Sequence, residues 1–330
     1  MAYYLAVDGG GTKTVAIITD KEGVILGFGL TGNCNHQISR EAAEFELKTA
    51  TEEALKSAGI KQSMLFRSCF GLAGADTAND FKIIHTMLQN LGFDKYAIYN
   101  DGLIALRAAD PAFAGITIIC GTATNAIGRD REGNIYQVGG YGYAFGDFGG
   151  GHQLSKEIFR LVIRSTEGRE PETLLTHLVL NKLGFKHMNA MYAYYLINKK
   201  SIPVHLTPLL FSAAEKGDEP ASQLIERQAE ELVLSTAALA EKMKLSSASF
   251  SLVLAGSVLT KSKNDLMYRA FLSKLGKTNL NAKVKLLKVE PVIGSSLLAI
   301  GDVVDEEKVR QNLIQSLPSV TKGSDADEQN

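Results

Sequence analysis

Runs of apolar residues separated by turn residues divide the first third of the chain into short strands and two helices. Apolar, β-branched runs predict strands at Tyr3–Val7, Thr14–Thr19, Val24–Leu30, Ser68–Leu72, Tyr96–Tyr99 and Ile116–Ile119. Apolar residues at helical spacing predict helices over Glu41–Ala58 and Asn79–Leu91. Three consecutive strands followed by strands that alternate with helices predict a mixed α/β sheet with parallel crossovers.

The opening pattern begins again near Gly115. An apolar strand at Ile116–Ile119, a small-residue turn at Gly121–Asn125 and a strand at Ala126–Arg129 repeat the first hairpin roughly 112 residues later. Asn134–Val138 supplies a third strand, as Val24–Leu30 does in the first copy. We interpret this as two copies of one domain type, with a chance likeness of two β-meanders as the alternative.

The remainder of the chain is mostly helical. Helical periodicity and apolar runs predict helices at His152–Ile163, Glu172–Leu183, Ala221–Met243 and Asn264–Leu275, strands at Phe250–Leu254 and Lys283–Val289, and a last helix at Gly294–Asp302. We expect domains at 1–114 and 115–303, the second with a helical insert at about 151–245. A C-terminal helix at 304–317 is a candidate addition to the first domain, and the polar tail 318–330 is expected to be disordered.

The composition of the chain argues against several functional classes. Apolar residues make up 45% and charged residues 22% of 330 residues, which is ordinary for a globular protein. A net charge of −1 offers no footprint for nucleic acid or an anionic membrane. No apolar run reaches the ~18 residues of a membrane span, and the start lacks the pattern of a secretion signal. Three widely spaced cysteines suggest neither disulfides nor a zinc site. We expect a cytoplasmic protein.

The turn Asp8-Gly9-Gly10-Gly11-Thr12-Lys13-Thr14 carries the first chemical signal. Three glycines leave backbone N–H groups open to the close approach of an anion. Two threonine hydroxyls and Lys13 add donors, and Asp8 could hold a hydrated Mg²⁺. The spacing fits neither a Walker A loop nor a dinucleotide fingerprint. It predicts a nucleotide-phosphate hairpin, with a tight hairpin that binds no ligand as the alternative.

Two later segments extend the first signal. Gly121–Asn125 has the same small residues and hydroxyl donors, so two such turns would hold a nucleotide's phosphates from both sides. Asn100-Asp101 follows the Tyr96–Tyr99 strand, at the edge where open α/β sheets bind ligands. Asp101 is therefore a candidate general base for a substrate hydroxyl, unless it only caps the next helix.

Glycine marks two further segments. Gly139–Gly151 holds seven glycines in thirteen residues together with four aromatic residues, which favours an ordered loop against a ligand over a flexible linker. Asp147 within it is a candidate for sugar or metal contacts. Ala255-Gly256-Ser257-Val258 follows a strand, and its glycine would let a flat ring such as adenine lie against the backbone.

Taken in order, these segments resemble the actin/hexokinase/Hsp70 ATPase superfamily. The chain is more narrowly similar to the N-acetylglucosamine kinase branch of the BadF/BadG/BcrA/BcrD ATPases. The residues that carry this likeness are DGGGTKT, Asn35-His36, LAGAD ending at Asp76, Asn100-Asp101, GTATN, the GGYG…GD segment from Gly139 to Asp147, and AGSV. The resemblance spans roughly residues 3–304. It implies two ribonuclease-H-like domains, each with a mixed central sheet, and a cleft between them.

The resemblance implies ATP- and Mg²⁺-dependent phosphorylation of the 6-hydroxyl of an amino sugar, with Asp101 as the catalytic base and Asp8 holding Mg²⁺ through water. It places ATP at Gly10, Gly11, Thr12, Lys13, Thr14, Gly121, Thr122, Thr124, Gly256 and Ser257. It places the sugar at Asn35, His36, Asp76, Asn100, Asp101, Asn125, Gly140, Tyr141 and Asp147. It further implies a homodimer that binds neither nucleic acid nor membrane.

The chain departs from this branch at two positions near the implied sugar site. Gln37 stands where an aromatic residue is expected, and Phe148 where an acidic one is common. N-acetylglucosamine is the expected sugar, with N-acetylmuramic acid or glucosamine as alternatives. An ATPase activator of an acyl-CoA dehydratase would need cysteine ligands for an iron–sulfur cluster, whereas Cys69 and Cys120 fall in apolar strands. A sugar-responsive repressor would need an N-terminal DNA-binding module, and the first strand already begins at Tyr3.

Overall fold

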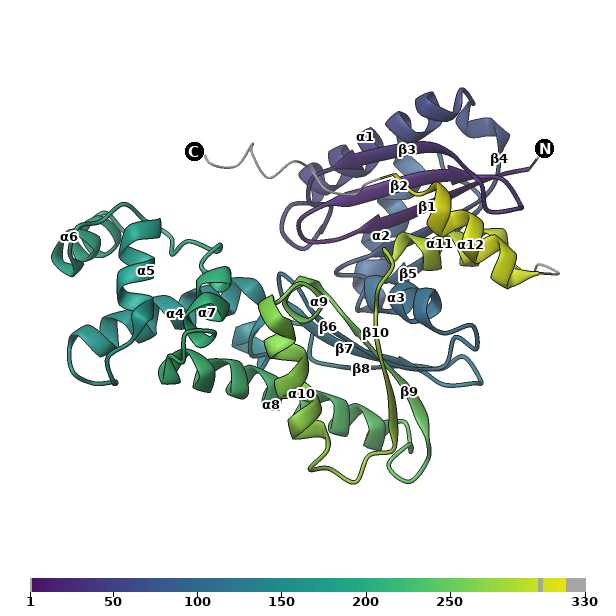
Figure 1. Cartoon of the computed structure of the whole chain (residues 1–330). Coiled ribbons are helices and arrows are strands. Elements are labelled where there is room, and N and C mark those ends of the chain that lie inside the picture. Colours follow the sequence, from purple (N-terminus) through teal and green to yellow (C-terminus); the bar gives the residue numbers. More distant parts are fainter. Residues whose placement is uncertain (1, 302–304, 319–330) are drawn as a thin grey trace. The chain divides into compact units, whose positions relative to one another are not determined.

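The computed structural model describes residues 2–301 and 305–318, which form two compact units, each with its own five-stranded sheet (Figure 1). Unit 1 takes its described residues from 2–114, 131–133, 287–301 and 305–318, and unit 2 comprises Gly115–Asp130 and Asn134–Leu286. The predicted boundary at 114/115 coincides with this division. Residues 287–301, which the sequence analysis grouped with the second domain, pack with unit 1.

The sheet of unit 1 has the order β3-β2-β1-β4-β5. Its strands are β1 (Tyr3–Gly9), β2 (Thr14–Thr19), β3 (Ile25–Thr31), β4 (Leu65–Leu72) and β5 (Tyr96–Asn100). The pairs β1–β2 and β2–β3 are antiparallel, whereas the pairs β1–β4 and β4–β5 are parallel. The helices are α1 (Arg40–Ala58), α2 (Ala78–Asn90), α3 (Asp101–Ala109), α11 (Val292–Ile300) and α12 (Glu306–Ser316), with a 3-10 turn η1 (Gln62–Met64).

Alternation along β4 explains the layers of unit 1. Phe70 and Leu72 belong to the apolar cluster that α1 and α2 complete. Cys69 and Gly71 alternate with them along the strand and therefore point to the other face. There Cys69 lies beside Ser295 of α11, and a methyl group at Gly71 would collide with Ile104 of α3. The sheet is thus covered by helices on both faces.

Unit 2 repeats this topology. Its order is β8-β7-β6-β9-β10, with β6–β7–β8 antiparallel and β6, β9 and β10 parallel. The strands are β6 (Gly115–Cys120), β7 (Thr124–Arg129), β8 (Ile135–Val138), β9 (Phe250–Ala255) and β10 (Ala282–Leu286). Because strand order and directions match unit 1 strand for strand, the predicted duplication is present in the fold.

The helices of unit 2 come mostly between β8 and β9 in the sequence. They are α4 (Gly150–Thr166), α5 (Leu174–Lys182), α6 (Met188–Tyr192), α7 (Thr207–Ala214), α8 (Glu219–Lys242), α9 (Ser257–Thr260) and α10 (Leu266–Leu275), with 3-10 turns η2 (Tyr143–Phe145) and η4 (Lys263–Asp265) and a π-helical turn η3 (Ala193–Ile197). Side chains of β6, β9, α8 and α10 share one core. Between the corresponding strands of unit 1, β3 and β4, the sequence forms one α-helix, α1.

Three predicted elements at the C-terminal end differ from the structure. The strand expected over Lys283–Val289 ends at Leu286, where the chain leaves the sheet of unit 2. The last apolar helix starts at Val292, one residue after Pro291, and ends at Ile300. The C-terminal helix expected at 304–317 is α12, Glu306–Ser316. The polar tail beyond Pro318 lies outside the described residues.

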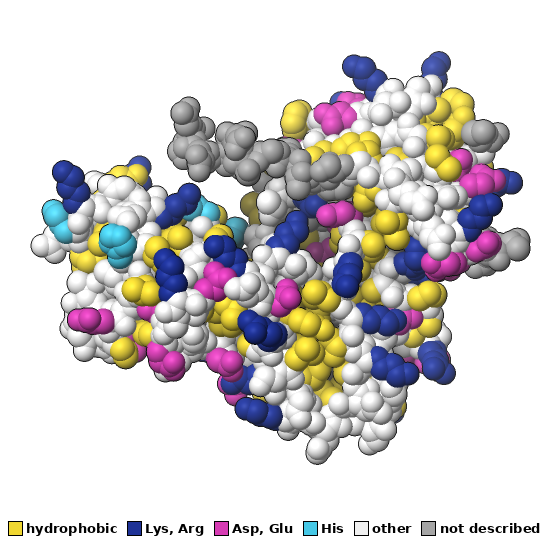
Figure 2. All heavy atoms as spheres, viewed as in Figure 1, with side chains coloured by type: hydrophobic (Ala, Val, Ile, Leu, Met, Phe, Trp, Pro, Cys, Tyr) yellow, Lys and Arg dark blue, Asp and Glu magenta, His cyan; other side chains and the backbone are white. Residues whose placement is uncertain are grey.

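No helix within the described ranges is both long and apolar enough to cross a bilayer. On the face drawn in Figure 2, acidic and basic side chains are interspersed, and no extended basic patch is visible.

Candidate functional site

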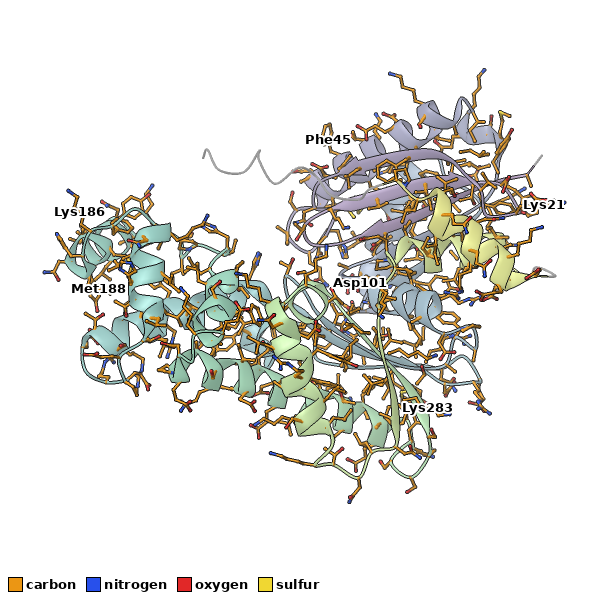
Figure 3. The ribbon with its side chains drawn as sticks, viewed as in Figure 1. Lys21, Phe45, Asp101, Lys186, Met188 and Lys283 are labelled. Atoms are coloured by element: carbon orange, nitrogen blue, oxygen red, sulfur yellow. The ribbon has the colours of Figure 1, made fainter. Side chains whose placement is uncertain are left out.

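In unit 1 the candidate residues gather where three parallel strands end together. Register pairs Gly9 of β1 with Leu72 of β4, and Leu72 with Asn100 of β5. Asp8 precedes the first of these positions, and Asp101 follows the last (Figure 3). The carboxyl edge of a parallel sheet is where α/β proteins bind ligands, so the topology brings the glycine turn and the candidate base to one edge.

The glycine turn is a tight hairpin, as its sequence predicted. The Gly10 N–H donates to the Lys13 carbonyl at 2.9 Å, and the Gly9 carbonyl accepts from Ala73 at 2.8 Å. Thr12 is exposed at the tip. Thr14, in contrast, is fully buried and its hydroxyl donates to the Gly32 carbonyl at 2.7 Å, so this hydroxyl serves the fold.

Lys13 forms an ion pair that the sequence did not suggest. Its Nζ lies 2.7 Å from Oε2 of Glu290, which precedes α11 in unit 1. Both side chains are about one-third exposed. The charge predicted for phosphate binding is therefore shared with a carboxylate.

The carboxyl of Asp8 is buried and that of Asp101 partly buried, and the two interact electrostatically. Burial, together with the charge of Asp101, raises the pKa of Asp8 to about 7, although Lys13 opposes the shift. Burial, together with the charge of Asp76, raises the pKa of Asp101 to about 7. A carboxyl with a pKa near neutrality is suited to take a proton at physiological pH.

Asn100 performs the helix capping that was the alternative role for Asp101. Its side-chain oxygen accepts from the Gly102 N–H at 2.8 Å, and Asn100 is the N-cap of α3. Asp101 is the first helical residue, and one of its oxygens accepts from the same N–H at 3.0 Å. The N-cap of α3 is therefore Asn100, and the catalytic role of Asp101 stays a prediction.

A hydrogen-bonded network extends from Asn100 through the loop after β4. Asn100 Nδ2 donates to Asp76 Oδ1 at 2.8 Å, and Gln37 Nε2 lies 3.4 Å from Asp76 Oδ2. The same Gln37 nitrogen lies 3.3 Å from Asp80 Oδ1. Asn35 accepts the Gln37 N–H at 2.9 Å. Unit 1 thus brings Asn35, Asp76 and Asn100 into one cluster.

His36 has a supporting position in this cluster. Its side chain is only 3% exposed, and Nε2 lies 2.9 Å from Asp80 Oδ1. Burial raises the pKa of Asp80, but hydrogen bonds with Thr77 and His36 outweigh burial and lower it. The Thr77–Asp80 pair forms a capping box at the start of α2. The sequence analysis did not select Asp80, although the spacing Thr-x-x-Asp is typical of a capping box.

Unit 2 brings its own turn and the Gly256 junction together. The Gly121 N–H donates to the Ala123 carbonyl at 3.0 Å, which closes a turn one residue shorter than the one that Gly10 closes on Lys13. Gly256 has a φ of +92°, and a methyl group there would lie 2.4 Å from the Cys120 carbonyl carbon. Glycine is therefore required at 256 for backbone packing, independently of any ring that lies against it. Ser257 begins α9 beside this contact.

The glycine-rich loop of unit 2 is organised by Asp147. Its carboxylate accepts from the N–H groups of Gly140 at 3.0 Å and Gly142 at 2.5 Å. A methyl group at Gly140 would lie 2.6 Å from Asn125 Oδ1, so these predicted sugar residues are neighbours. Tyr141 is 48% exposed. The loop is ordered, and in this structure the Asp147 carboxylate orders it.

Gln228 of α8 holds the C-terminal end of this loop and was missed from the sequence. It is fully buried, accepts from the Gly150 N–H at 3.2 Å and donates to the Phe148 carbonyl at 3.3 Å. Thr124 Oγ1 lies 3.5 Å from the same carbonyl. The start of α4 packs against the turn, because Gly151 and His152 donate to the carbonyls of Gly121 and Thr122. A glutamine in an apolar helical stripe gives no local signal of such a role.

The carboxylates of unit 1 fit a hydrated divalent cation. The charge of Asp101 acts on Asp8, and Lys13, the cation that opposes this effect at Asp8, is already paired with Glu290. Within the described ranges no three His, Cys, Asp or Glu side chains form a metal cage of their own. Mg²⁺ commonly uses one or two carboxylates plus water and substrate phosphates, so Asp8 is the residue that would hold it.

Comparison with known proteins places this fold and site in context. The chain is 29% identical over 304 residues to the N-acetylmuramic acid/N-acetylglucosamine kinase of Clostridium acetobutylicum, covering 91% of this chain and 98% of the relative. It is 26% identical over 312 residues to the N-acetyl-D-glucosamine kinase of Dictyostelium discoideum, covering 90% and 97%. Among solved structures, a candidate N-acetylglucosamine kinase from Chromobacterium violaceum shares the fold, with a TM-score of 0.70, 22% identity, and coverage of 91% and 99%.

The family model of the BadF/BadG/BcrA/BcrD ATPases matches residues 5–299, which include both glycine turns, the Asp101 edge and the Gly256 junction. The resemblance drawn from the motifs is thereby confirmed at the level of the family. This chain belongs to the BadF/BadG/BcrA/BcrD ATPase family.

Proposed function

We propose that this protein is an ATP-dependent kinase that phosphorylates the 6-hydroxyl of an amino sugar, with N-acetylglucosamine as the main acceptor. The observation that carries the proposal is the position of Asp101 at the shared carboxyl edge of β1, β4 and β5, beside Asp8 and Asp76, with a pKa of about 7. Two curated relatives that match nine-tenths of the chain are kinases of N-acetylated amino sugars.

In this mechanism each residue has a defined task. The Asp101 carboxylate accepts the proton of the sugar hydroxyl as the hydroxyl oxygen attacks the γ-phosphorus of ATP. The bond from the γ-phosphorus to the β,γ-bridging oxygen breaks, and ADP leaves. The cluster of Asn35, Asp76 and Asn100 orients the sugar. Backbone N–H groups of the glycine turns and the Thr12 and Thr122 hydroxyls bind phosphate oxygens. Mg²⁺ held through Asp8 would supply charge neutralisation at the phosphates.

Charge in unit 1 favours an acceptor without a carboxylate. Asp8, Asp76, Asp80 and Asp101 lie along one edge, and Lys13 is paired with Glu290. An anionic group brought to this cluster is repelled. This supports N-acetylglucosamine or glucosamine over N-acetylmuramic acid as the preferred sugar.

The activator alternative has weak support. Cys34, Cys69 and Cys120 are all buried, and burial raises the pKa of each thiol to about 12. Thiolate ligands for a cluster shared between two chains have to reach the surface. None of the three cysteines does so in the described structure.

A coupled ADP-release assay tests the proposal. Mg-ATP is supplied with N-acetylglucosamine, glucosamine, N-acetylmuramic acid, glucose or no sugar. ADP release that depends on an amino sugar, with the 6-phosphate identified by NMR, is the expected result. Release that no sugar changes would reject the kinase and favour the activator-type ATPase.

A further inference from the structure

The side chain of Gln37 joins two carboxylates at the candidate sugar cluster. Its Nε2 lies 3.3 Å from Asp80 Oδ1 and 3.4 Å from Asp76 Oδ2, and it donates to the Gly74 carbonyl at 3.2 Å. An amide nitrogen carries two hydrogens. These two hydrogens are shared among three acceptors, the Gly74 carbonyl and the two carboxylates, so Gln37 is a donor common to both carboxylates.

Gln37 is itself held in place. Its backbone N–H donates to Asn35 Oδ1, and the Asn35 N–H donates to Asn33 Oδ1 at 2.7 Å. Asp80 is fixed by the capping box with Thr77 and by buried His36. The glutamine side chain therefore extends from a rigid support.

Asp76 lies at the other end of this network from Asp80 and accepts hydrogen bonds from two side chains. Its Oδ1 accepts from Asn100, which is fixed because it caps α3, and its Oδ2 is the oxygen nearest Gln37. Asp76 also interacts electrostatically with Asp101. Asn100 and Gln37 thus each hold one oxygen of the Asp76 carboxylate, and replacing Gln37 removes one of these two donors.

We propose that Gln37 is a positioning residue that orients the Asp76 carboxylate for hydrogen bonds with the acceptor sugar and so helps to set which amino sugar is bound. This inference rests on the proposed kinase function. Gln37 acts on the sugar through Asp76, so its effect falls on the acceptor and leaves the nucleotide unaffected.

The first test compares Gln37→Leu with Gln62→Leu. Gln62 belongs to the same unit and makes a similar amide bond, to the Leu91 carbonyl at 2.9 Å, outside the cluster. Gln37 is exposed, so its replacement opens no core cavity. We expect Gln37→Leu to raise the sugar KM about 3- to 10-fold, with the KM for ATP and the melting temperature unchanged. Gln62→Leu should leave both KM values as in the wild type.

A second variant and a double-mutant cycle separate positioning from general damage. Gln37→Glu keeps the shape but places a third carboxylate beside Asp76 and Asp80, so the sugar KM should rise further. Gln37→Leu combined with Asp76→Asn should be no worse than Asp76→Asn alone, since the glutamine acts through Asp76. Fully additive effects would overturn the inference.

Turnover by the wild-type enzyme separates the failure of the proposed role of Gln37 from the failure of the proposed kinase function. Turnover on an amino sugar, combined with an unchanged sugar KM in Gln37→Leu, overturns the role of Gln37 and leaves the kinase intact. Absence of turnover on every sugar in the panel overturns the proposed kinase and this inference with it. A raised sugar KM accompanied by a changed ratio of N-acetylglucosamine to glucosamine use supports both.

Discussion

Asp8 and Asp101 are carboxyls of one unit, and the charge of Asp101 raises the free energy of ionised Asp8. Burial is the leading cause of both raised pKa values, and a neighbouring charge adds to it, that of Asp101 for Asp8 and that of Asp76 for Asp101. Buried acidic pairs of this kind are costly for stability and occur at sites that carry chemistry. At the scale of single residues, the cost and the proposed function have the same origin.

The first prediction concerns Asp101. A general base must be ionised, so kcat/KM for the sugar should rise with pH through about 7 and level off above it. Asp101→Asn should lower kcat by roughly 10²–10⁴-fold and lose this pH dependence. Sugar binding, measured by calorimetry, should persist. Near-normal turnover in the variant would show that Asp101 is not the base.

The second prediction concerns Asp8 and stability. Its pKa is raised from 3.8 to about 7, so the folded state binds a proton that the unfolded chain releases. Stability from this group is therefore present below about pH 4 and is lost as pH rises to about 7. Without Mg²⁺, Asp8→Asn should increase the free energy of unfolding at pH 8 by about 1–3 kcal/mol, with little change at pH 4.

Urea unfolding of both proteins at pH 4 and pH 8 measures this effect. The same variant should lose activity, because the residue proposed to hold Mg²⁺ is gone. An equal effect on stability at the two pH values would contradict the assigned pKa shift.

Among the elements, α12 shows how a C-terminal helix is attached to the N-terminal unit. Arg107 of α3 is 9% exposed and forms two hydrogen bonds to Glu306, of 2.7 and 2.6 Å. Arg310 donates to the Ala108 carbonyl. Val309 and Leu313 provide the buried face of the helix. The paired charges fix its first turn against α3.

The third prediction is that Glu306→Gln destabilises the protein by about 1–3 kcal/mol, because a nearly buried guanidinium loses its partner charge. Hydrogen bonds from Arg107 hold the pKa of Glu306 below its ordinary value. The contribution is therefore present above pH 4.5 and lost as pH falls further. Thermal unfolding at pH 7 measures it, with exposed Glu307→Gln as the matched control. Equal melting temperatures for the two variants would contradict the prediction.

How far the sequence predicts the structure depends on whether a feature is local. The strands and the two glycine turns follow from apolar runs and turn residues, and the duplication follows from their repetition. The Lys13–Glu290 pair joins residues 277 apart, and Gly294 approaches Ile104 so closely that a methyl group would lie 1.9 Å from its carbonyl oxygen. Neither has a local signature, because tertiary packing creates both.

The same distinction applies to the candidate site. Asp101 and the glycine turns could be selected because residue type and strand end coincide. The capping roles of Asn100 and Asp80 follow from short spacings that an analysis of helix starts can recognise. Gln37 stood out only as a departure from the family pattern, without its contacts, and Gln228 could not be found, since an amide becomes informative only when its partners from other elements are known.

For the whole molecule, the duplicated topology places a small-residue turn after the first strand of each unit. The Gly10 N–H closes the first turn on the carbonyl three residues later, and the Gly121 N–H closes the second on the carbonyl two residues later. Thr12 lies two residues after Gly10, and Thr122 directly follows Gly121. On the proposed function, both threonines bind phosphate oxygens of one nucleotide.

The fourth prediction follows from this pairing. Thr12→Ala and Thr122→Ala should each raise the KM for ATP about 5- to 20-fold, because each removes a hydrogen bond to a charged group. The KM for the sugar should stay within a factor of two. Steady-state kinetics with either substrate varied provide the measurement. A change confined to one of the two variants would mean that only that turn binds phosphate.

The route of the chain at its C-terminal end determines the order in which the protein can be completed during synthesis. Ser295 of α11 donates to the carbonyl of Val7, 288 residues earlier, and α11 packs on β1 and β4. A ribosome releases unit 2 in full before it releases the helix that covers one face of the first sheet. The face of β1 and β4 that α11 covers is therefore left uncovered by this helix until residues 292–300 have been synthesised. Nascent-chain truncations ending before residue 292 should therefore require a chaperone to stay soluble.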